Sequence, residues 1–335
     1  EYQKAFDLFQ GAHGDLEQIP ALRQANLHYA NVIARVPTFG PAYHNRSDLY
    51  VHILMNDVSG QLNPGVTEEE VANALPYATS LYSKAVENAR NPAERLAGEF
   101  DLAMISGNWR GLAGRAERVF DEGGCSVTNW LAPIAALYGH SNGYLKRAQE
   151  ILICDPLYSI MWYNASRAAL WSGDSASALE FAEKANELAP SEWIDVVHVR
   201  ALVANGQFEE AKRINSTRVQ HNLFAVFGDL IISAAQGKSG EAATQFEAFR
   251  EQPGVDAFYN LSVNAWLGHR DAANRIAAKI DKHPFAHHVL TLMIYWCACG
   301  APFDLEAAPN YAAKIEEAGF VWPPPSPINF PLKDW

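Results

Sequence analysis

Three histidines near the C-terminal end have the spacing that comes closest to metal chemistry. His283, His287 and His288 form the tightest imidazole cluster of the chain, but Pro284 separates the first from the other two. A zinc-type site needs ligands that converge, usually two histidines on one helical face with a carboxylate nearby. This stretch instead resembles the start of a helix. We therefore expect the three histidines to cap that helix or to lie at the surface.

The cysteines offer little chemistry either. Cys125, Cys154, Cys297 and Cys299 are too few and too scattered to indicate a disulfide framework. We expect Cys297 and Cys299 on one helix, where positions two apart point in different directions and chelate poorly, so core packing is their expected role. The catalytic signatures HExxH and GxSxG and the dinucleotide-binding glycine fingerprint do not occur in the sequence, and no cofactor is expected.

Composition describes an acidic, folded protein. Of 335 residues, 49% are hydrophobic and 19% are charged, which excludes wholesale disorder. A net charge of −12 makes nucleic acid or an anionic membrane a poor partner. The longest apolar run, residues 289–299, is too short to span a bilayer. Because the chain begins at Glu1 rather than Met, we expect a processed protein or an excised fragment, from either the cytoplasm or the periplasm.

The elements that must position any site are helices arranged as a repeat. From Pro92 onward a glycine follows each expected first helix at intervals of 31 to 34 residues. A glycine turn with this period predicts pairs of helices that bury their apolar faces only against neighbouring pairs. Small residues recur about five positions later, where two helices must cross closely. The glycines are Gly107, Gly139, Gly173, Gly206, Gly237, Gly268 and Gly300, and the small residues are Ala178, Ala211, Ala242 and Ala273.

The clearest unit is 159–190. Two amphipathic helices, 160–171 and 175–188, flank Gly173-Asp174, and Pro190 ends the second helix. Further helices are expected over 1–14, 16–36, 41–56, 67–91 and 304–318. Residues 321–335 contain five prolines and are expected to be extended. We expect this tail to cover apolar surface on the last helices or to enter a groove of its own or a neighbouring chain.

The best unit resembles the tetratricopeptide repeat, with Trp162, Gly173-Asp174, Ala178, Ala185 and Pro190 at the family's positions. The resemblance extends over about residues 17–318. It implies an all-α fold, a right-handed superhelical solenoid of about eight antiparallel helix pairs. Residues 1–320 would form one array, followed by the Pro-rich C-terminal tail, 321–335. The opening EYQKAFDLFQGAHG and the segment 37–43 are similar to repeat arrays C-terminal to bacterial winged-helix regulators or class III adenylate cyclases.

The resemblance also implies a binding site, because the first helices of the family line a concave groove. Asparagine is well suited to such a groove, since its amide both donates to and accepts from an extended peptide. The same residues can also simply pack or face water. The implied groove residues are His44, Asn45, Asp48, Tyr163, Asn164, Arg167, Trp171, Arg200, Tyr259 and Asn260.

These features favour a non-enzymatic scaffold that binds a protein, a peptide or a small-molecule signal in its concave face. It would be the sensor or assembly part of a larger bacterial signalling regulator. An enzyme on a helical-repeat scaffold, for example a glycan-processing one with carboxylates in the concave channel, is the alternative, and self-association is a third hypothesis. Two convergent carboxylates in a deep closed pocket would indicate the enzyme. An open groove of Asn, Arg and Tyr would indicate the binding module.

Overall fold

The computed structural model describes residues 1–12, 18–60, 65–122, 125, 131–217, 223–250, 257–326 and 328. Throughout these residues the secondary structure is helical, without strands, which confirms the all-α prediction. The helices are α1 (Tyr2–Ala12), α2 (Gln18–Arg35), α3 (Gly40–Ser59), α4 (Glu68–Glu87), α5 (Pro92–Ser106), α6 (Leu112–Asp121), α7 (Ala132–Ala136), α8 (Ser141–Cys154), α9 (Ser159–Trp171), α10 (Ser175–Leu188), α11 (Glu192–Ala204), α12 (Phe208–Ser216), α13 (Leu223–Ala235), α14 (Ser239–Arg250), α15 (Ala257–Trp266), α16 (Arg270–Ile280), α17 (Ala286–Cys297), η1 (Leu305–Ala307) and α18 (Pro309–Ala318).

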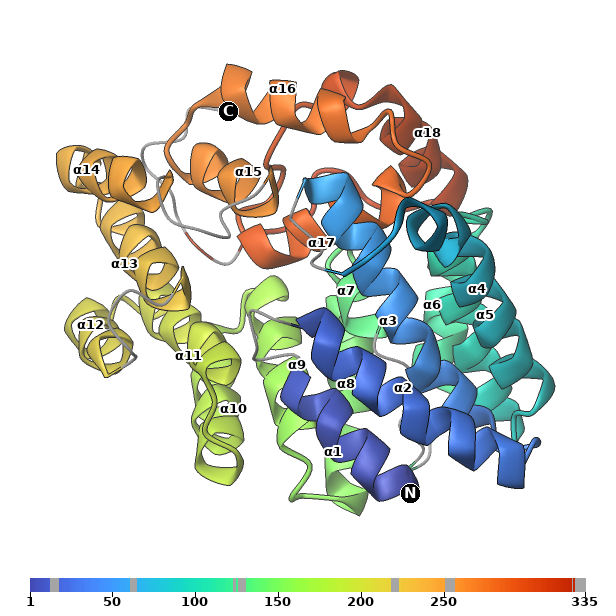
Figure 1. Ribbon diagram of the computed structural model, residues 1–335. Helices are drawn as coiled ribbons and strands as arrows, with labels where there is room; N and C mark the ends of the chain where they lie inside the picture. The colour runs from blue at the N-terminus through green and yellow to red at the C-terminus, as the bar shows by residue number, and fades with distance from the viewer. Residues whose placement is uncertain are drawn as a thin grey trace.

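Consecutive helices pack against each other along the chain (Figure 1). All seven glycines predicted to separate the helices of a pair have positive φ angles, between 70° and 97°. Each follows an odd-numbered helix from α5 to α17. A left-handed backbone angle costs a residue with a Cβ free energy but suits glycine, so these positions end the first helix and turn the chain into the second. The predicted period of helix pairs is thus confirmed over this part of the chain.

The small residues that were expected at helix crossings are buried. Ala178, Ala211, Ala242 and Ala273 each have 0% of their surface exposed. At the first of these the Ser166 hydroxyl on α9 donates to the Ala178 carbonyl on α10 at 2.7 Å. A contact this close leaves no room for a longer side chain between the two helices.

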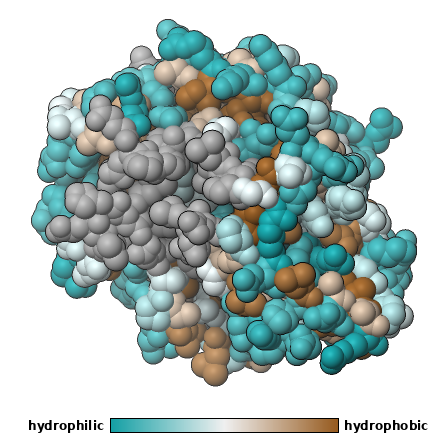
Figure 2. Space-filling model, viewed as in Figure 1, coloured by the Kyte–Doolittle hydropathy of each residue, from teal (hydrophilic) through white to brown (hydrophobic). Residues whose placement is uncertain are grey.

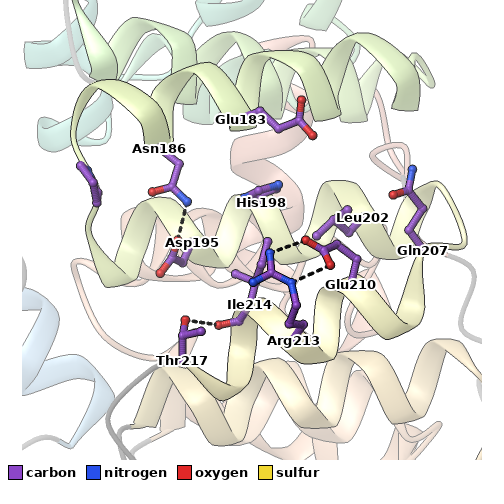
Figure 3. Close-up of a pocket in the computed structure, with 11 residues that line it drawn as sticks. Glu183, Asn186, Asp195, His198, Leu202, Gln207, Glu210, Arg213, Ile214 and Thr217 are labelled. Carbon is purple, nitrogen blue, oxygen red and sulfur yellow. Dashed lines mark hydrogen bonds and ion pairs between the residues drawn. The ribbon is translucent and has the colours of Figure 1, made fainter.

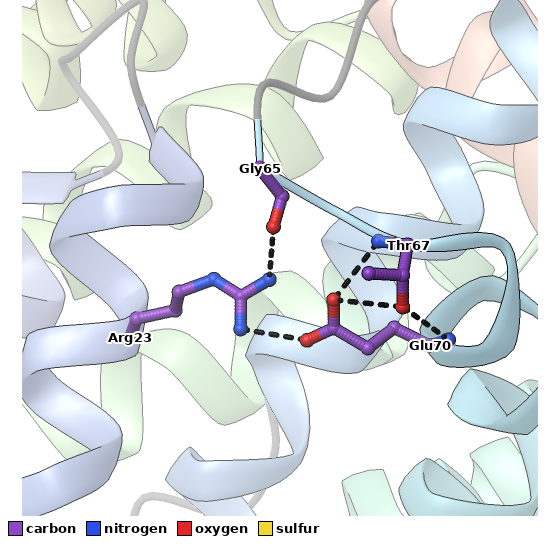
Figure 4. Close-up of polar contacts among 4 residues, drawn as sticks. All are labelled: Arg23, Gly65, Thr67 and Glu70. Carbon is purple, nitrogen blue, oxygen red and sulfur yellow. Dashed lines mark hydrogen bonds and ion pairs between the residues drawn. The ribbon is translucent and has the colours of Figure 1, made fainter.

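A capping box begins α4 and ties it to α2 (Figure 4). The Thr67 hydroxyl accepts from the Glu70 amide at 3.2 Å, and the Glu70 carboxylate accepts from the Thr67 amide at 3.0 Å. Arg23 on α2 donates to the same carboxylate at 2.7 Å and to the Gly65 carbonyl at 3.2 Å. The Arg23 hydrogen bond is the main reason that the pKa of Glu70 is lowered to about 2.

The array closes on itself. Helix α17 packs on α3 and α7 of the N-terminal half as well as on α15, and α18 packs on α6 (Figure 1). The Gly111 amide at the start of α6 donates to the Glu317 carbonyl of α18 at 2.9 Å, and Lys314 donates to the Gly107 carbonyl at 2.6 Å. The last helix pair therefore lies against residues about 200 positions earlier in the sequence.

The described part of the tail packs against the last helices. Trp322 lies 5.9 Å from Phe303 and 6.3 Å from Tyr311 between ring centroids. Ile328 is buried beside Cys297 and Cys299. The tail thus covers apolar surface at α17 and α18, one of its two expected roles. Residue 327 and residues 329–335 lie outside the described part of the chain.

The cysteines pair, contrary to expectation. Disulfides join Cys125 to Cys154 and Cys297 to Cys299. Cys299 is not on a helix, because α17 ends at Cys297 and Ala298 takes a left-handed φ of 50° that turns the chain back. Both Cys297 and Cys299 are buried, so core packing was the correct expectation for their environment.

Ala178→Leu is expected to destabilise the array. The added carbon atoms have no space between α9 and α10, and overpacking of this kind typically costs about 1–3 kcal/mol. Chemical denaturation measures the loss. Ala176→Leu, an exposed position on the same helix, is the matched control and should leave the transition nearly unchanged. Equal transitions for both variants would contradict the close crossing.

Candidate functional site

Helices α3, α5, α7, α9, α11 and α15 each turn one side toward α17. We call the surface that these sides form the inner face, and α17 occupies it. The resemblance assigns a groove to this face. Four of the implied groove residues are on α9, and three of them, Tyr163, Arg167 and Trp171, are only 2% to 5% exposed. Their surroundings include Tyr295 and Trp296 of α17. The structure therefore brings these predicted residues together, but around a helix of the same chain.

Arg167 lies at the centre of this contact. Its guanidinium carbon is 3.5 Å from the Tyr295 ring centroid and 5.4 Å from those of Tyr163 and Trp171. One terminal nitrogen donates to the Tyr163 hydroxyl at 2.6 Å, and the other donates to the Tyr295 carbonyl at 2.7 Å. Stacking on aromatic faces and charge-assisted hydrogen bonds together stabilise a buried cation that would otherwise be costly.

Arg200, one repeat further on, makes the equivalent contact. It donates to the Trp296 carbonyl, and its guanidinium carbon lies 5.9 Å from the ring centroids of both Trp296 and Phe227. Trp266 of α15 donates from its indole nitrogen to the Cys297 carbonyl at 3.2 Å. Three side chains of first helices thus hydrogen-bond three successive carbonyls of α17.

These carbonyls are the ones that need external partners. The last four carbonyls of a helix have no acceptor role within it, and they carry the negative end of the helix dipole. Two arginines are well matched to that end in both charge and hydrogen-bonding capacity. The inner face therefore recognises the C-terminal end of α17 by its backbone.

The other end of α17 contacts a group of histidines and aspartates that is buried except for the partly exposed His44. We call it the His–Asp cluster: His44, Asp48, His52, Asp101 and His288. His52 lies 3.3 Å from Asp48, and His44 lies 3.6 Å from Asp101. His288 belongs to the group through its electrostatic interaction with His52 and Asp48.

Burial sets the charge state of this cluster. It lowers the pKa of His288 to about 3 and that of His44 to about 4, since a buried imidazolium loses its hydration. It also raises the pKa of Asp101 well above its usual range. The two histidines are therefore uncharged near neutral pH. In the described residues no group of three or more His, Cys, Asp or Glu side chains could hold a metal ion.

The C-terminal histidines differ from expectation. His287 and His288 are buried in α17 rather than at the surface, and the His287 ring nitrogen donates to the Ile105 carbonyl at 3.3 Å. His283 is partly exposed just before α17, where its ring nitrogen accepts from the Phe285 amide at 3.1 Å but caps no amide of the helix. His287 and His288 are buried because α17 has neighbours on many sides and no solvent-facing half.

The remaining implied residues make separate contacts. Asn45 donates to the Tyr29 hydroxyl at 3.1 Å, within the α2–α3 contact. Asn164 is buried and interacts with Tyr144 of α8. Tyr259 packs on Phe227, with 5.7 Å between ring centroids. Asn260 lines an open groove on the outer face.

Open grooves of this kind lie on the outer face, the side of the array formed by the second helices, at α10–α12 and at α14–α16. The acidic outer groove lies among α10, α11 and α12 and has a volume of about 760 Å³ (Figure 3). Arg213 pairs with Glu210 at 2.5 Å, and the Asn186 amide donates to Asp195 at 2.9 Å. Its lining residues are Glu183, Asn186, Pro190, Asp195, His198, Leu202, Gln207, Glu210, Arg213, Ile214 and Thr217, which include three acidic side chains and one arginine.

The basic outer groove has the corresponding position among α14, α15 and α16, with a volume of about 850 Å³. In both grooves two successive second helices form the walls, and the first helix between them forms the floor. The sign of the charge differs. The basic outer groove is lined by Phe246, Glu247, Arg250, Ala257, Asn260, Asn264, Gly268, His269, Arg270, Asp271, Ala272, Arg275, Ile276 and Lys279, which include four basic and two acidic side chains.

The rest of the visible surface is mixed. Hydrophilic residues dominate the face seen in Figure 2, with hydrophobic residues in small groups between them. Ile153 and Leu157, which are strongly exposed, lie at the end of α8 and in the turn to α9. Scattered apolar exposure of this kind is usual on protein surfaces, so we assign it no binding role. No described helix is long and apolar enough to cross a membrane.

No protein-family model matches the chain, and no curated protein is significantly similar to it. The site is therefore interpreted from its geometry alone.

Arg167→Met should weaken the attachment of α17. The variant removes the donor to the Tyr295 carbonyl, and a buried hydrogen bond to a charged group contributes about 1.5–3 kcal/mol. Urea unfolding followed by tryptophan fluorescence measures the effect. Arg118→Met, an exposed position on α6, is the control and should change the transition by less than about 0.5 kcal/mol. Equal stability of the two variants would exclude Arg167 as an anchor.

His288 should make the protein less stable in mild acid. The unfolded chain takes up this proton near pH 6.5, whereas the folded protein does so only near pH 3, so stability falls as the pH drops through this interval. Asp101, with a raised pKa, has the opposite effect in wild type and variant alike. The unfolding free energy of His288→Gln should therefore vary less between pH 7 and pH 4.

Thr291→Val is the control for this pH profile. Thr291 is buried on α17 and donates to the His287 carbonyl at 2.7 Å, but it does not titrate. This variant should lower stability equally at every pH. If the unfolding free energy of His288→Gln varied with pH as it does in wild type, this would contradict the burial of a neutral imidazole.

Proposed function

We propose that this chain is a non-enzymatic binding module of the tetratricopeptide type, a right-handed superhelix that receives partners in its outer grooves. One observation carries the proposal. The inner face is filled by α17, whereas two open grooves recur at the same position of the repeat. A protein or peptide partner is the ligand best suited to such open surfaces, and a small-molecule signal is a second class. The module would serve as the sensor or assembly part of a larger signalling protein.

Access explains the preference for the outer face. A partner in the inner face must first displace α17, which buries five large apolar side chains. Each contributes about 1.5–3 kcal/mol when it is buried, so displacement costs on the order of 10 kcal/mol. That cost is comparable to the entire binding free energy of a micromolar complex, about 8 kcal/mol. The five side chains are Val289, Leu290, Leu292, Met293 and Ile294.

The enzyme hypothesis is the weaker one. The candidates for its required pair of carboxylates are Asp48 and Asp101 of the His–Asp cluster. Both residues are buried, at 4% and 0% exposure, and neither lines an outer groove. A carboxylate works as a general acid or base only within reach of a substrate. We therefore assign the cluster no catalytic role.

Peptide selection with variants that fill the grooves tests the proposal. Peptides selected from a random library on the wild-type protein are assayed against Thr217→Trp in the acidic outer groove and Ala272→Trp in the basic outer groove. Their affinity should fall for at least one of these variants, because the indole occupies the peptide's space. Ala176→Trp, an exposed position outside both grooves, is the bulk-matched control and should bind normally.

Photo-cross-linking then locates the bound peptide. Cross-links to α12 or α16 are the expected result. Cross-links to α9 or α17, with affinities indifferent to both groove variants, would overturn the proposal in favour of the inner face.

A further inference from the structure

We propose that the basic outer groove binds a short acidic peptide segment of a partner protein. This inference rests on the proposed function and adds the chemistry of the ligand. The groove carries a local excess of positive charge on a protein whose net charge is −12. A cluster of basic side chains on an acidic protein is consistent with a role in binding, and recognition of carboxylates is such a role.

Two cations of α16 are open to a ligand. Arg275 and Lys279 are one helical turn apart, so their side chains lie on the same face of the helix. Both are exposed and line the groove. Neither forms an ion pair with a carboxylate of the described residues. A fork-shaped guanidinium and an ammonium at this spacing can bind two carboxylates of one extended segment.

The other two basic side chains have structural partners. Arg270 forms a two-point contact with Asp304, at 2.6 and 2.7 Å, which fixes the N-terminal end of α16 against the segment before η1. Arg250 lies 5.6 Å from the Phe246 ring centroid and 3.5 Å from Glu247. These contacts hold the walls in place and leave α16 as the charged surface that faces a ligand.

The floor of the groove suits a peptide backbone. Asn260 and Asn264 lie one turn apart on α15, and the Asn264 amide donates to the Asn260 carbonyl at 2.7 Å. His269 approaches the Asn264 side-chain oxygen at 3.2 Å, which orients this amide. Asn264 is buried and both ends of its side chain are engaged, so it fixes the floor. Asn260 is the lining residue whose side-chain amide can donate to and accept from a main chain. Phe246 and Ile276 add apolar surface for side chains between the acidic ones.

The charge of the whole molecule selects a short ligand over a polyanion. Electrostatic interactions are screened over about 8 Å at physiological ionic strength, so a ligand confined to the groove senses mainly the groove. A nucleic acid extends beyond it and meets an acidic surface. Two further carboxylates in the lining, Glu247 and Asp271, reduce the local excess of positive charge and also disfavour a densely charged ligand.

Charge reversal tests the inference directly. A fluorescent peptide of about ten residues, with glutamate alternating with alanine, is titrated with the intact protein, and anisotropy gives the dissociation constant. Arg275→Glu/Lys279→Glu should weaken binding at least about tenfold, and Arg275→Gln/Lys279→Gln should weaken it less. The neutral variant also guards against misfolding of the charge-reversed one. A matched peptide with lysine in place of glutamate should not bind this groove.

Lys84→Glu/Lys184→Glu is the matched control. It changes the net charge by the same amount at Lys84, exposed on α4, and at Lys184, partly exposed on α10, and both lie outside the basic outer groove. This control should alter the dissociation constant by less than about twofold, because long-range charge is screened. Equal weakening by control and charge-reversal variants would overturn the inference.

Competition separates the remaining outcomes. Displacement of the peptide by inorganic phosphate at equal charge concentration would make the groove a simple anion site. If a single-stranded oligonucleotide bound more tightly than the peptide and lost as much affinity on charge reversal, the groove would be a nucleic-acid site. Either result overturns the peptide proposal. If library peptides cross-link to α16 without acidic preference, this inference fails and the proposed function stands. Cross-links confined to the inner face would remove the proposed function itself.

Discussion

The structure depends on the capture of the carbonyl end of α17 by arginines of the inner face. Arg167 and Arg200 come from successive first helices and donate to two successive carbonyls of α17. Each arginine is buried and stacks on aromatic rings, two of which belong to α17 itself. If one partner were removed while the other stayed buried, the remaining cation or carbonyl would have neither a hydrogen-bond partner nor water. The free-energy cost of such a group stabilises the arrangement.

Closure of the inner face decides where the molecule can meet others. An open solenoid offers its concave side, but here that side has become core, with His288 and Asp101 buried at one end and Arg167 at the other. The outer face keeps open grooves between successive second helices, as at α10–α12 and α14–α16. Most of the charged side chains that line them lie on second helices.

Local features were predictable from the sequence, and contacts between distant segments were not. The glycine turns follow from backbone sterics, and buried positions such as Ala178 follow from the close crossing of neighbouring helices. The residues of the inner face were found through the resemblance, but the sequence did not reveal that α17 covers them. An apolar stretch such as 289–299 predicts that these residues are buried, but it does not predict which helices they pack against. The pairing of Cys297 with Cys299 depended on the left-handed angle of Ala298, which no local rule for alanine predicts. The grooves were not predicted from the sequence, because three helices share their lining and the lining consists of ordinary surface residues.

Hydrogen–deuterium exchange of the backbone amides of α17 tests the central claim most directly. If this helix fills the inner face, residues 286–297 should exchange as slowly as those of α9, because both open only when the array unfolds. Rapid exchange in α17 alongside slow exchange in α9 and α11 would show that the helix leaves the inner face without unfolding the array, and would contradict the account.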